Sequence, residues 1–213
     1  MQETPGRAFL DRRGLKAATI QAGGLGWNPT DLYFDRQAWG IADETMQDRK
    51  AKRLWIPRGL VIPCMSGEKI IRLRIRSPSG DPRYVIIPGS SSSPLKAGED
   101  TGAAVIVESE LDAMLLCQEA GDLALMIALG SVAIRPDTNT HARLKRAKII
   151  LNALDADQSG AKEAWGFWIA TYGRKVKRWP VPTGKDPGEA YQAGIDLREW
   201  VEAGADGILQ KEQ

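Results

Sequence analysis

Histidine and cysteine are scarce in this 213-residue chain, which contains one histidine, His141, and two cysteines, Cys64 and Cys117. Because the cysteines stand far apart and have no histidine beside them, the sequence predicts neither a disulfide framework nor a zinc site, and we expect both thiols in the core. The lone histidine, interpreted as an exposed helix residue, argues against hydrolytic mechanisms that need a histidine base. Carboxylates and a bound metal ion are then the expected chemistry.

Long apolar runs are also absent. No stretch approaches the ~20 apolar residues of a membrane span, and the first residues, MQETPGR, lack the basic-then-apolar form of a signal peptide. We therefore expect a cytoplasmic protein without a membrane partner. With 43% hydrophobic residues, the chain is long enough for one large domain or two small ones, each with a core of its own.

The chain has no large excess of charge, since its formal net charge is +2, but the two signs are unevenly distributed. The segment from Arg49 to Arg83 carries ten lysines and arginines against two acids, Glu68 and Asp81. The acidic motifs come later in the chain. A basic surface beside an acidic, metal-loaded one suits a polyanion held over a catalytic centre.

Two later segments, Ala104–Ala113 and Ile149–Gly160, each begin with aliphatic residues and continue into acids. An aliphatic run without alternation predicts a strand covered on both faces, as in a parallel α/β sheet, and ligands bind such sheets at the carboxyl ends of the strands. We expect Glu108, Asp155 and Asp157 to converge at one rim. Since Asp155 and Asp157 are two residues apart, they are expected to point the same way and share Mg²⁺.

Two further acids are candidates for the same rim. Asp112 lies four residues after Glu108, in the turn into the following helix, and Asp186 lies in the segment TGKDPGE with Lys185 beside it. The helix that starts just after Asp157 is expected to present backbone N–H groups to phosphate. The ordinary alternatives are an Asp-Pro turn at Asp186 and a capping or surface pair for the Asp-x-Asp motif.

Arg72, Arg74 and Arg76 alternate with Leu73 and Ile75, which predicts a half-buried strand with one apolar face and three guanidinium groups on the other. Two interpretations stay open. The arginine face is either a solvated sheet surface or a track for a phosphate backbone.

The order of predicted elements begins with helices ending at Gly14 and spanning about 15–22. A turn over LGWNPT, a loop with one helical turn over 31–52, and short strands forming an antiparallel meander follow. The Ser-, Gly- and Pro-rich stretch 88–100 is interpreted as a linker. Strands and helices then alternate, at 104–108, 110–119, 123–129, 140–146, 149–154, 159–172 and 175–179, before two short C-terminal helices.

This alternation predicts an α/β fold: a Rossmann-type parallel sheet with helices on both faces, preceded by a smaller α+β subdomain with an antiparallel basic sheet. The predicted parts are an N-terminal basic nucleic-acid-binding subdomain (1–98), a catalytic subdomain (99–182) and a C-terminal helical extension (183–213). The aromatic residues Trp165, Phe167 and Trp168 are expected in the core rather than in a base-stacking platform.

The motifs VESELDA (107–113), LDADQSG (154–160) and TGKDPGE (183–189) resemble, in order and spacing, the Toprim domain of topoisomerases and DnaG-type primases over about residues 103–195. The earlier pattern FLDRRGL followed by GLGW resembles the start of the primase polymerase domain. The resemblance implies Glu108, Asp155 and Asp157 as catalytic residues. Together with Asp112 and Asp186, they are the implied ligands of Mg²⁺, or of Mn²⁺ in its place.

In the resembling primases, residues equivalent to Arg74 or Arg76 and to Arg83 contact nucleic acid or nucleotide, and Arg58 is a further candidate. Arg72 and Lys185 complete the predicted set. Two positions depart from the pattern: Ser109 stands where the commonest signature has glycine, and Gly188 stands where many primases have a second acid. The departure at Gly188 puts a second metal position in doubt.

The function implied by the resemblance is template-directed synthesis of short RNA primers on single-stranded DNA from ribonucleoside triphosphates. A topoisomerase is not expected, because the four tyrosines offer no obvious catalytic equivalent. The alternatives are a Toprim-type metal-dependent nuclease and a non-catalytic DNA-binding protein of a mobile element. Since no zinc module or helicase-docking domain is recognised, we expect a fragment of a larger primase or a minimal phage or mobile-element protein. A replicative helicase would then be contacted through regions absent from this chain.

Overall fold

The computed structural model describes residues 4–46, 51–79, 81–131, 133–154 and 161–209. The chain forms two compact units, one made of Met1–Leu10 and Ile20–Ser92 and the other of Asp11–Thr19 and Ser93–Gln213. The short segment 11–19 therefore belongs with the second unit, although the sequence placed it in an N-terminal part ending at residue 98. Each unit has a sheet and a hydrophobic cluster of its own.

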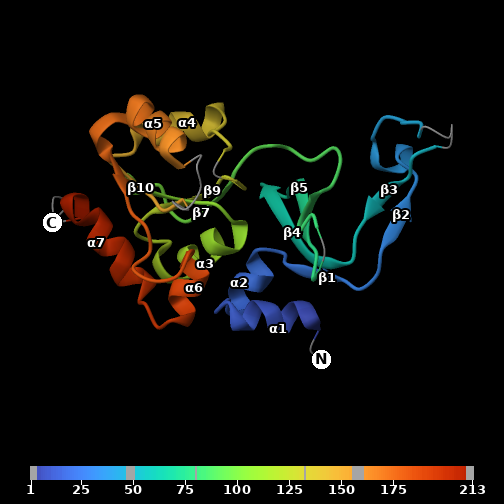
Figure 1. Cartoon of the computed structure of the whole chain (residues 1–213), viewed down its shortest axis with the longest axis horizontal. Helices are drawn as coiled ribbons and strands as arrows, with labels where there is room; N and C mark the ends of the chain where they lie inside the picture. Colours follow the sequence, from blue (N-terminus) through green and yellow to red (C-terminus); the bar gives the residue numbers. More distant parts are fainter. Residues whose placement is uncertain (1–3, 47–50, 80, 132, 155–160, 210–213) are drawn as a thin grey trace. The chain divides into compact units, whose positions relative to one another are not determined.

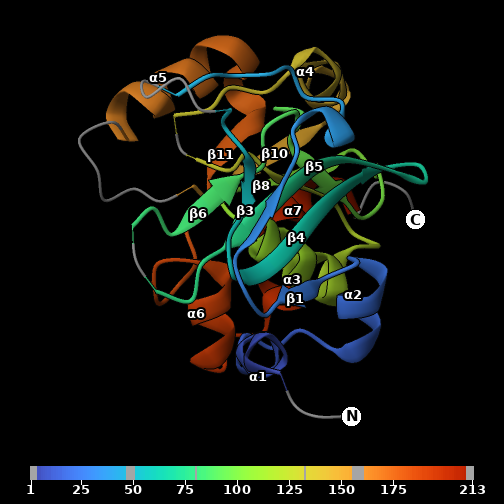
Figure 2. The ribbon, with the colours of Figure 1, turned by 90° about the vertical axis from the view of Figure 1, so that its right-hand side faces the viewer.

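Two short helices begin the chain, and the first unit continues with two eight-residue strands, β4 and β5, and several three-residue ones. Their bounds are α1 Pro5–Arg12, α2 Ala17–Ala22, β1 Gly26–Asn28, β2 Leu32–Phe34, the 3₁₀ turn η1 Gln37–Trp39, β3 Leu54–Ile56, β4 Gly59–Ser66, β5 Lys69–Arg76 and β6 Tyr84–Ile86. The strands β1, β4, β5 and β6 form an antiparallel sheet in the order β1-β4-β5-β6, while β2 and β3 pair separately. Figure 2 shows the long strands β4 and β5 side by side.

The predicted meander is correct for β4, β5 and β6 but wrong at its start. The LGWNPT segment, predicted as a turn, contains strand β1, because Gly26–Asn28 pairs with Gly59–Val61 of β4. The segment 31–52, predicted as a loop with one helical turn, does contain a turn, η1, but it also contains β2, which takes β3 as its partner. Strands β1 and β2 have only three residues each, which is too short for a hydrophobic periodicity to be detected in the sequence. They are strands because distant segments of the chain pair with them.

The second unit contains most of the helices. Its elements are β7 Leu95–Ala97, β8 Ala103–Val107, α3 Glu110–Ala120, β9 Leu125–Ala128, α4 Thr138–Arg146, β10 Ile149–Asn152, α5 Ala161–Tyr172, the 3₁₀ turn η2 Gly173–Lys175, β11 Val176–Arg178, α6 Pro187–Gln192 and α7 Leu197–Leu209. Strands β11, β10, β8 and β9 are neighbours in that order, and their parallel pairing confirms the predicted parallel sheet.

Strand β7 pairs antiparallel with β9 at the sheet edge, so the sheet is mixed. Residues 95–97 were predicted to be part of a linker, and this prediction is wrong because they form strand β7. Leu95 is buried there and faces Ala128 in the register. The surrounding Ser, Gly and Pro residues hid this one short pairing segment.

Helices cover both faces of the parallel strands, as predicted (Figure 1). Every residue of β8, β9 and β10 is buried, and alternate side chains enter opposite faces. On one face, Ile106 and Ile150 pack in a cluster with Leu144 of α4 and Trp168 of α5. On the other face, α3 packs against β9 and α7 packs against β10. This two-sided burial explains why the strands lack polar alternation.

Trp168 belongs to the cluster of Ile106 and Ile150, and Trp165 and Phe167 pack against that cluster. This confirms their assignment to the core. Cys64 is buried and Cys117 is half-buried, and neither is part of a disulfide. His141 is half-buried rather than exposed, because its ring Nδ1 lies 2.9 Å from the hydroxyl of Tyr172. No helix in the described ranges is long and apolar enough to cross a membrane.

Candidate functional site

Parallel pairing brings the carboxyl ends of β8 and β10 together. Asn152 of β10 is level with Ile106 of β8, so Glu108 and Leu154 lie two residues beyond paired positions on neighbouring strands. Backbone bonds continue this alignment: Ala153 N–H donates to Ile106 C=O at 2.9 Å, and Gly130 N–H donates to Glu108 C=O at 2.8 Å. Glu108 therefore stands at the strand rim, as predicted, where it is half-buried.

Asp155 follows Leu154 directly and Asp157 comes two residues later, and both lie outside the described residues. Asn152, which the sequence reasoning missed, fixes the backbone of the last described residues before them. Its buried side-chain Oδ1 accepts the N–H of Leu154 at 3.1 Å, closing a turn immediately after β10. The available signal was an asparagine at the end of an otherwise aliphatic run.

Ser109 and Asp112 shape the start of α3. The Ser109 hydroxyl caps the helix by accepting the N–H of Asp112 at 3.2 Å, and it also donates to Asp112 Oδ2. A serine is therefore well suited to the position where the resembling signature has glycine. Asp112 is only 2% exposed, and burial raises the pKa of its carboxyl group, with Arg13 acting in the opposite direction.

We predict that Ser109→Ala lowers the free energy of unfolding by about 1 kcal/mol, because the helix loses its N-cap and Asp112 loses a hydrogen-bond donor. Urea unfolding followed by circular dichroism measures this difference. Ser109→Thr, which keeps a hydroxyl, is the matched control and should retain most of the stability. Equal stability of Ser109→Ala and the native chain would contradict the capping role.

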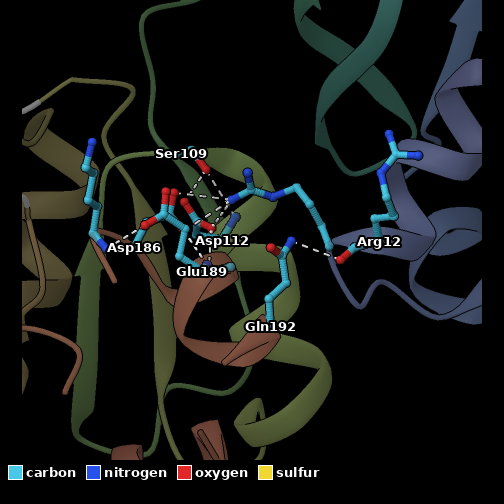
Figure 3. A network of polar contacts seen from close by, with 9 residues as sticks. Arg12, Ser109, Asp112, Asp186, Glu189 and Gln192 are labelled. Atoms are coloured by element: carbon cyan, nitrogen blue, oxygen red, sulfur yellow. Dashed lines mark hydrogen bonds and ion pairs between the residues drawn. The ribbon is translucent and has the colours of Figure 1, made fainter. Parts of the chain in front are cut away.

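Arg13 is the centre of a polar network that joins three elements. Its Nη2 lies 2.7 Å from Asp112 Oδ1 and 3.4 Å from Asp186 Oδ2. Gly188 N–H donates to the same Asp112 Oδ1 at 3.2 Å, and Asp186 caps α6 by accepting the N–H of Glu189 at 2.8 Å. Figure 3 shows Ser109, Asp112, Asp186 and Glu189 gathered in this network. Asp186, for which an ordinary Asp-Pro turn was the alternative interpretation, is the N-cap of α6.

The segment around Arg13 is itself held by α3 and α6. Gly14 adopts a φ of +83°, and a Cβ at this position would lie 2.2 Å from the Tyr191 ring, so only glycine fits without movement. Gln118 donates to Gly14 C=O at 2.9 Å, and Gln192 donates to Arg12 C=O at 2.9 Å (Figure 3). The signal for Arg13 was the Leu-x-x-Arg-Gly pattern, to which the sequence reasoning assigned no site residue.

The predicted arginine row lies on β5, and its apolar partners face a core. Ile75 and Leu73 belong to a cluster with Leu54 and Ile56, which confirms the half-buried strand. The arginine side is more enclosed than an open solvated face. Arg72 is 5% exposed, which differs from the prediction of three presented guanidinium groups.

Aromatic rings cover the other two arginines of the row. The Arg74 guanidinium lies 4.2 Å from the centroid of Tyr84, and that of Arg76 lies 4.1 Å from the centroid of Phe9. Such stacking orients a guanidinium while leaving its charge intact. Among the other predicted contacts, Arg58, Arg83 and Lys185 are exposed.

Within the described ranges, no three His, Cys, Asp or Glu side chains are close enough together to hold a metal ion. Glu108, Asp112 and Asp186 therefore do not form such a group by themselves. The predicted metal site depends on what Asp155 and Asp157 add to Glu108.

Comparison with known proteins gives a match in structure only. No protein-family model matches the sequence, and no curated protein matches it. A DNA primase domain from Pseudomonas aeruginosa superposes with a TM-score of 0.68 at 22% identity, covering 98% of this chain and 75% of that one. A DnaG primase catalytic domain bound to single-stranded DNA gives 0.67 at 16% identity, covering 95% and 75%.

The zinc-binding and RNA polymerase domains of the Aquifex aeolicus primase superpose with a TM-score of 0.64 at 17% identity. The match covers 98% of this chain but 60% of that longer one. The α/β sheet and the antiparallel sheet of this chain thus have the fold of DnaG primase catalytic cores.

Proposed function

We propose that this chain is the catalytic core of a DnaG-type DNA primase, which synthesises short RNA primers from ribonucleoside triphosphates on a single-stranded DNA template. The observation that carries the proposal is the position of Glu108. It stands directly after β8, beside the carboxyl end of β10 that leads into Asp155 and Asp157, within the fold of primase catalytic cores. Carboxylates at this rim are well suited to metal-dependent phosphate chemistry.

In this proposal, Glu108, Asp155 and Asp157 hold Mg²⁺, or Mn²⁺ in its place. The ion would offset charge on the triphosphate and align the reacting oxygens. Glu108 suits a ligand role because its backbone is fixed by the bond from Gly130 N–H to its carbonyl, so its carboxylate starts from a rigid position. No covalent protein intermediate is required.

The template would be bound by the basic residues of the first unit. Arg58 and Arg83 are exposed, and the stacked guanidinium groups of Arg74 and Arg76 lie on a common strand. These cations can contact phosphates without reading sequence. Because Arg72 is buried, we propose that it supports the strand that carries this basic surface. The exposed Lys185 is proposed to bind the triphosphate of the incoming nucleotide.

The test is incubation of the purified chain with single-stranded DNA, labelled ribonucleotides and Mg²⁺ or Mn²⁺, with Asp155→Ala as the inactive comparison. Short RNA products that need Asp155 support the proposal. A shortened template would instead identify a metal-dependent nuclease. If the chain binds DNA but forms no product at any enzyme concentration, the primase assignment fails in favour of a binding protein.

We predict that Arg83→Ala weakens binding to single-stranded DNA of any sequence. The dependence of log affinity on log salt should become less steep, by the amount that corresponds to about one lost phosphate contact. Fluorescence anisotropy over a range of salt concentrations measures both quantities. Arg174→Ala removes the same charge from an exposed position in η2 of the second unit and should leave the slope unchanged. Identical slopes for Arg83→Ala and the native chain would remove Arg83 from the template surface.

A further inference from the structure

We infer that Tyr33 and Trp55 form a base-stacking platform for single-stranded DNA. The two residues lie on the outer face of the two-stranded sheet β2–β3 in the first unit (Figure 1). Neither residue was among the predicted nucleic-acid contacts, which were all cations. The inference rests on the proposed function for the identity of the DNA as a template, and it adds contacts to bases where the arginines supply contacts to phosphates.

The pairing of β2 with β3 puts both aromatic rings on one face. Tyr33 is directly opposite Trp55 in the register. Side chains alternate between the two faces of a strand, and directly opposite residues share a face with Cβ atoms about 4.5–5.5 Å apart. The other face is the apolar one, because Leu54 and Ile56 belong to the hydrophobic cluster of the first unit. Phe34 packs against the same cluster, so Tyr33 and Trp55 point away from it together.

Both rings are open to solvent. Tyr33 is 51% exposed and Trp55 is 41% exposed, whereas the neighbours of Trp55 in β3 are buried. A single exposed apolar residue is common on a protein surface, but two large rings directly opposite each other form a continuous flat patch. Each of the four DNA bases has a π-face that stacks on such rings, so binding of this kind is tolerant of sequence.

The two strands are fastened to each other at both ends. Near one end, Arg53 Nη2 donates to the backbone carbonyl of Tyr33. Near the other end, the N–H of Arg58 donates to Asp31 Oδ1 at 2.7 Å. The rings therefore stand on a fixed backbone before any ligand binds. A preorganised surface loses less conformational freedom on binding than a flexible one.

The charges around the rings favour a nucleic acid as the partner. Cations flank β3 and acids flank β2: the cations are Lys52, Arg53 and Arg58, and the acids are Asp31 and Asp35. Lys52 is in an ion pair with Glu44 at 2.8 Å, so Arg53 and Arg58 carry most of the effect. Each of the two acids accepts a backbone N–H.

This distribution also gives the bound strand an orientation. Phosphates would lie along the basic edge at β3, with the bases over Tyr33 and Trp55 and the acidic edge of β2 away from the phosphates. Arg58, already proposed to contact the template, follows Trp55 by three residues and extends the same edge. Flat aromatic rings with a basic edge are the features of a single-strand site rather than of an apolar protein contact.

The test compares two single-stranded oligonucleotides of about 12 nucleotides, one with bases and one made of abasic sites, by fluorescence anisotropy with the full chain. Trp55→Ala should weaken binding of the base-containing strand by about tenfold and of the abasic strand by less than about twofold. The salt dependence should stay unchanged, because no phosphate contact is lost. Trp55→Phe, which keeps a ring, should retain most of the affinity.

Trp39→Ala is the matched control. It removes a tryptophan of similar exposure, 46%, from η1, where the ring contacts Phe34 rather than the platform. Its affinity for both oligonucleotides should equal that of the native chain. Native affinity of Trp55→Ala for the base-containing strand, or an equal loss on the two strands, would overturn the inference.

A measurement on the native chain avoids any effect of substitution on folding. Single-stranded DNA containing iodouracil, irradiated in complex with the chain, should form crosslinks to Tyr33 or Trp55 that mass spectrometry locates. Crosslinks that all lie in other peptides would overturn the inference and leave this face to a protein partner.

The two experiments also separate the platform from the proposed function. If the chain stacks bases on Tyr33 and Trp55 but synthesises no RNA, the platform stands and the primase assignment fails. If the chain synthesises primers while Trp55→Ala binds DNA normally, the platform fails and the primase assignment stands. A native chain that binds neither oligonucleotide would overturn both.

Discussion

Glu108→Gln is expected to lower the rate of ribonucleotide incorporation by about a thousandfold, because loss of an anionic metal ligand removes on the order of 4 kcal/mol of charge stabilisation at the reacting phosphate. The substitution keeps the size and shape of the side chain. Glu108 follows β8, and its backbone carbonyl accepts the N–H of Gly130, a bond that the substitution does not change. The fold should therefore be retained. Single-turnover incorporation at saturating Mg²⁺ measures the loss.

Glu99→Gln is the matched control for this experiment. Glu99 is exposed and precedes β8, at the amino end of the same strand, so the change in net charge is identical but the location is opposite. Its incorporation rate should equal that of the native chain. If Glu108→Gln incorporates nucleotides as fast as Glu99→Gln does, the strand rim is not the catalytic centre and the proposed function is wrong.

Trp168→Ala is expected to lower the free energy of unfolding by about 3–5 kcal/mol, the usual cost of emptying a large core position. Trp168 is fully buried, stacks on Tyr172 with ring centroids 5.4 Å apart, and packs in the cluster that also holds Ile106 and Ile150. Denaturant unfolding followed by circular dichroism measures the effect. The same variant should also lose metal affinity, because the cluster supports β8 and β10.

The neighbouring residue supplies the control for the core prediction. Ile169 lies on the same helix but is 42% exposed, so Ile169→Ala removes apolar atoms from the surface of α5 without opening a cavity. Its stability should fall far less than that of Trp168→Ala. Comparable losses for the two variants would mean that α5 does not pack on the sheet as described.

The parts of this molecule that could be predicted from sequence are those whose pattern is local. Unbroken aliphatic runs predicted β8, β9 and β10, because burial on both faces requires apolar residues at every position. The strand-end position of Glu108 followed from the same pattern. Alternation predicted β5 and its apolar face, since one side of an antiparallel strand enters the core.

The parts that were missed depend on partners far away in the chain. Strands β1 and β7 have three residues each and exist because β4 and β9 offer backbone groups to pair with. Arg13 is separated from Asp112 by 99 residues and from Asp186 by 173, so no spacing rule connects them. Their meeting is a property of the packed helices α3 and α6, and single-sequence periodicity carries no record of it.

The membership of residues 11–19 in the second unit means that this unit is not a continuous stretch of sequence. A fragment that begins at Ser93 would contain the whole mixed sheet and yet lack the guanidinium opposite Asp112. Removing one partner of a buried charged pair typically costs about 3–5 kcal/mol, a large share of the stability of a small domain. Dissection at the apparent boundary would therefore give a weakened piece, whereas rejoining residues 11–19 to it through a short linker would restore an intact folding unit.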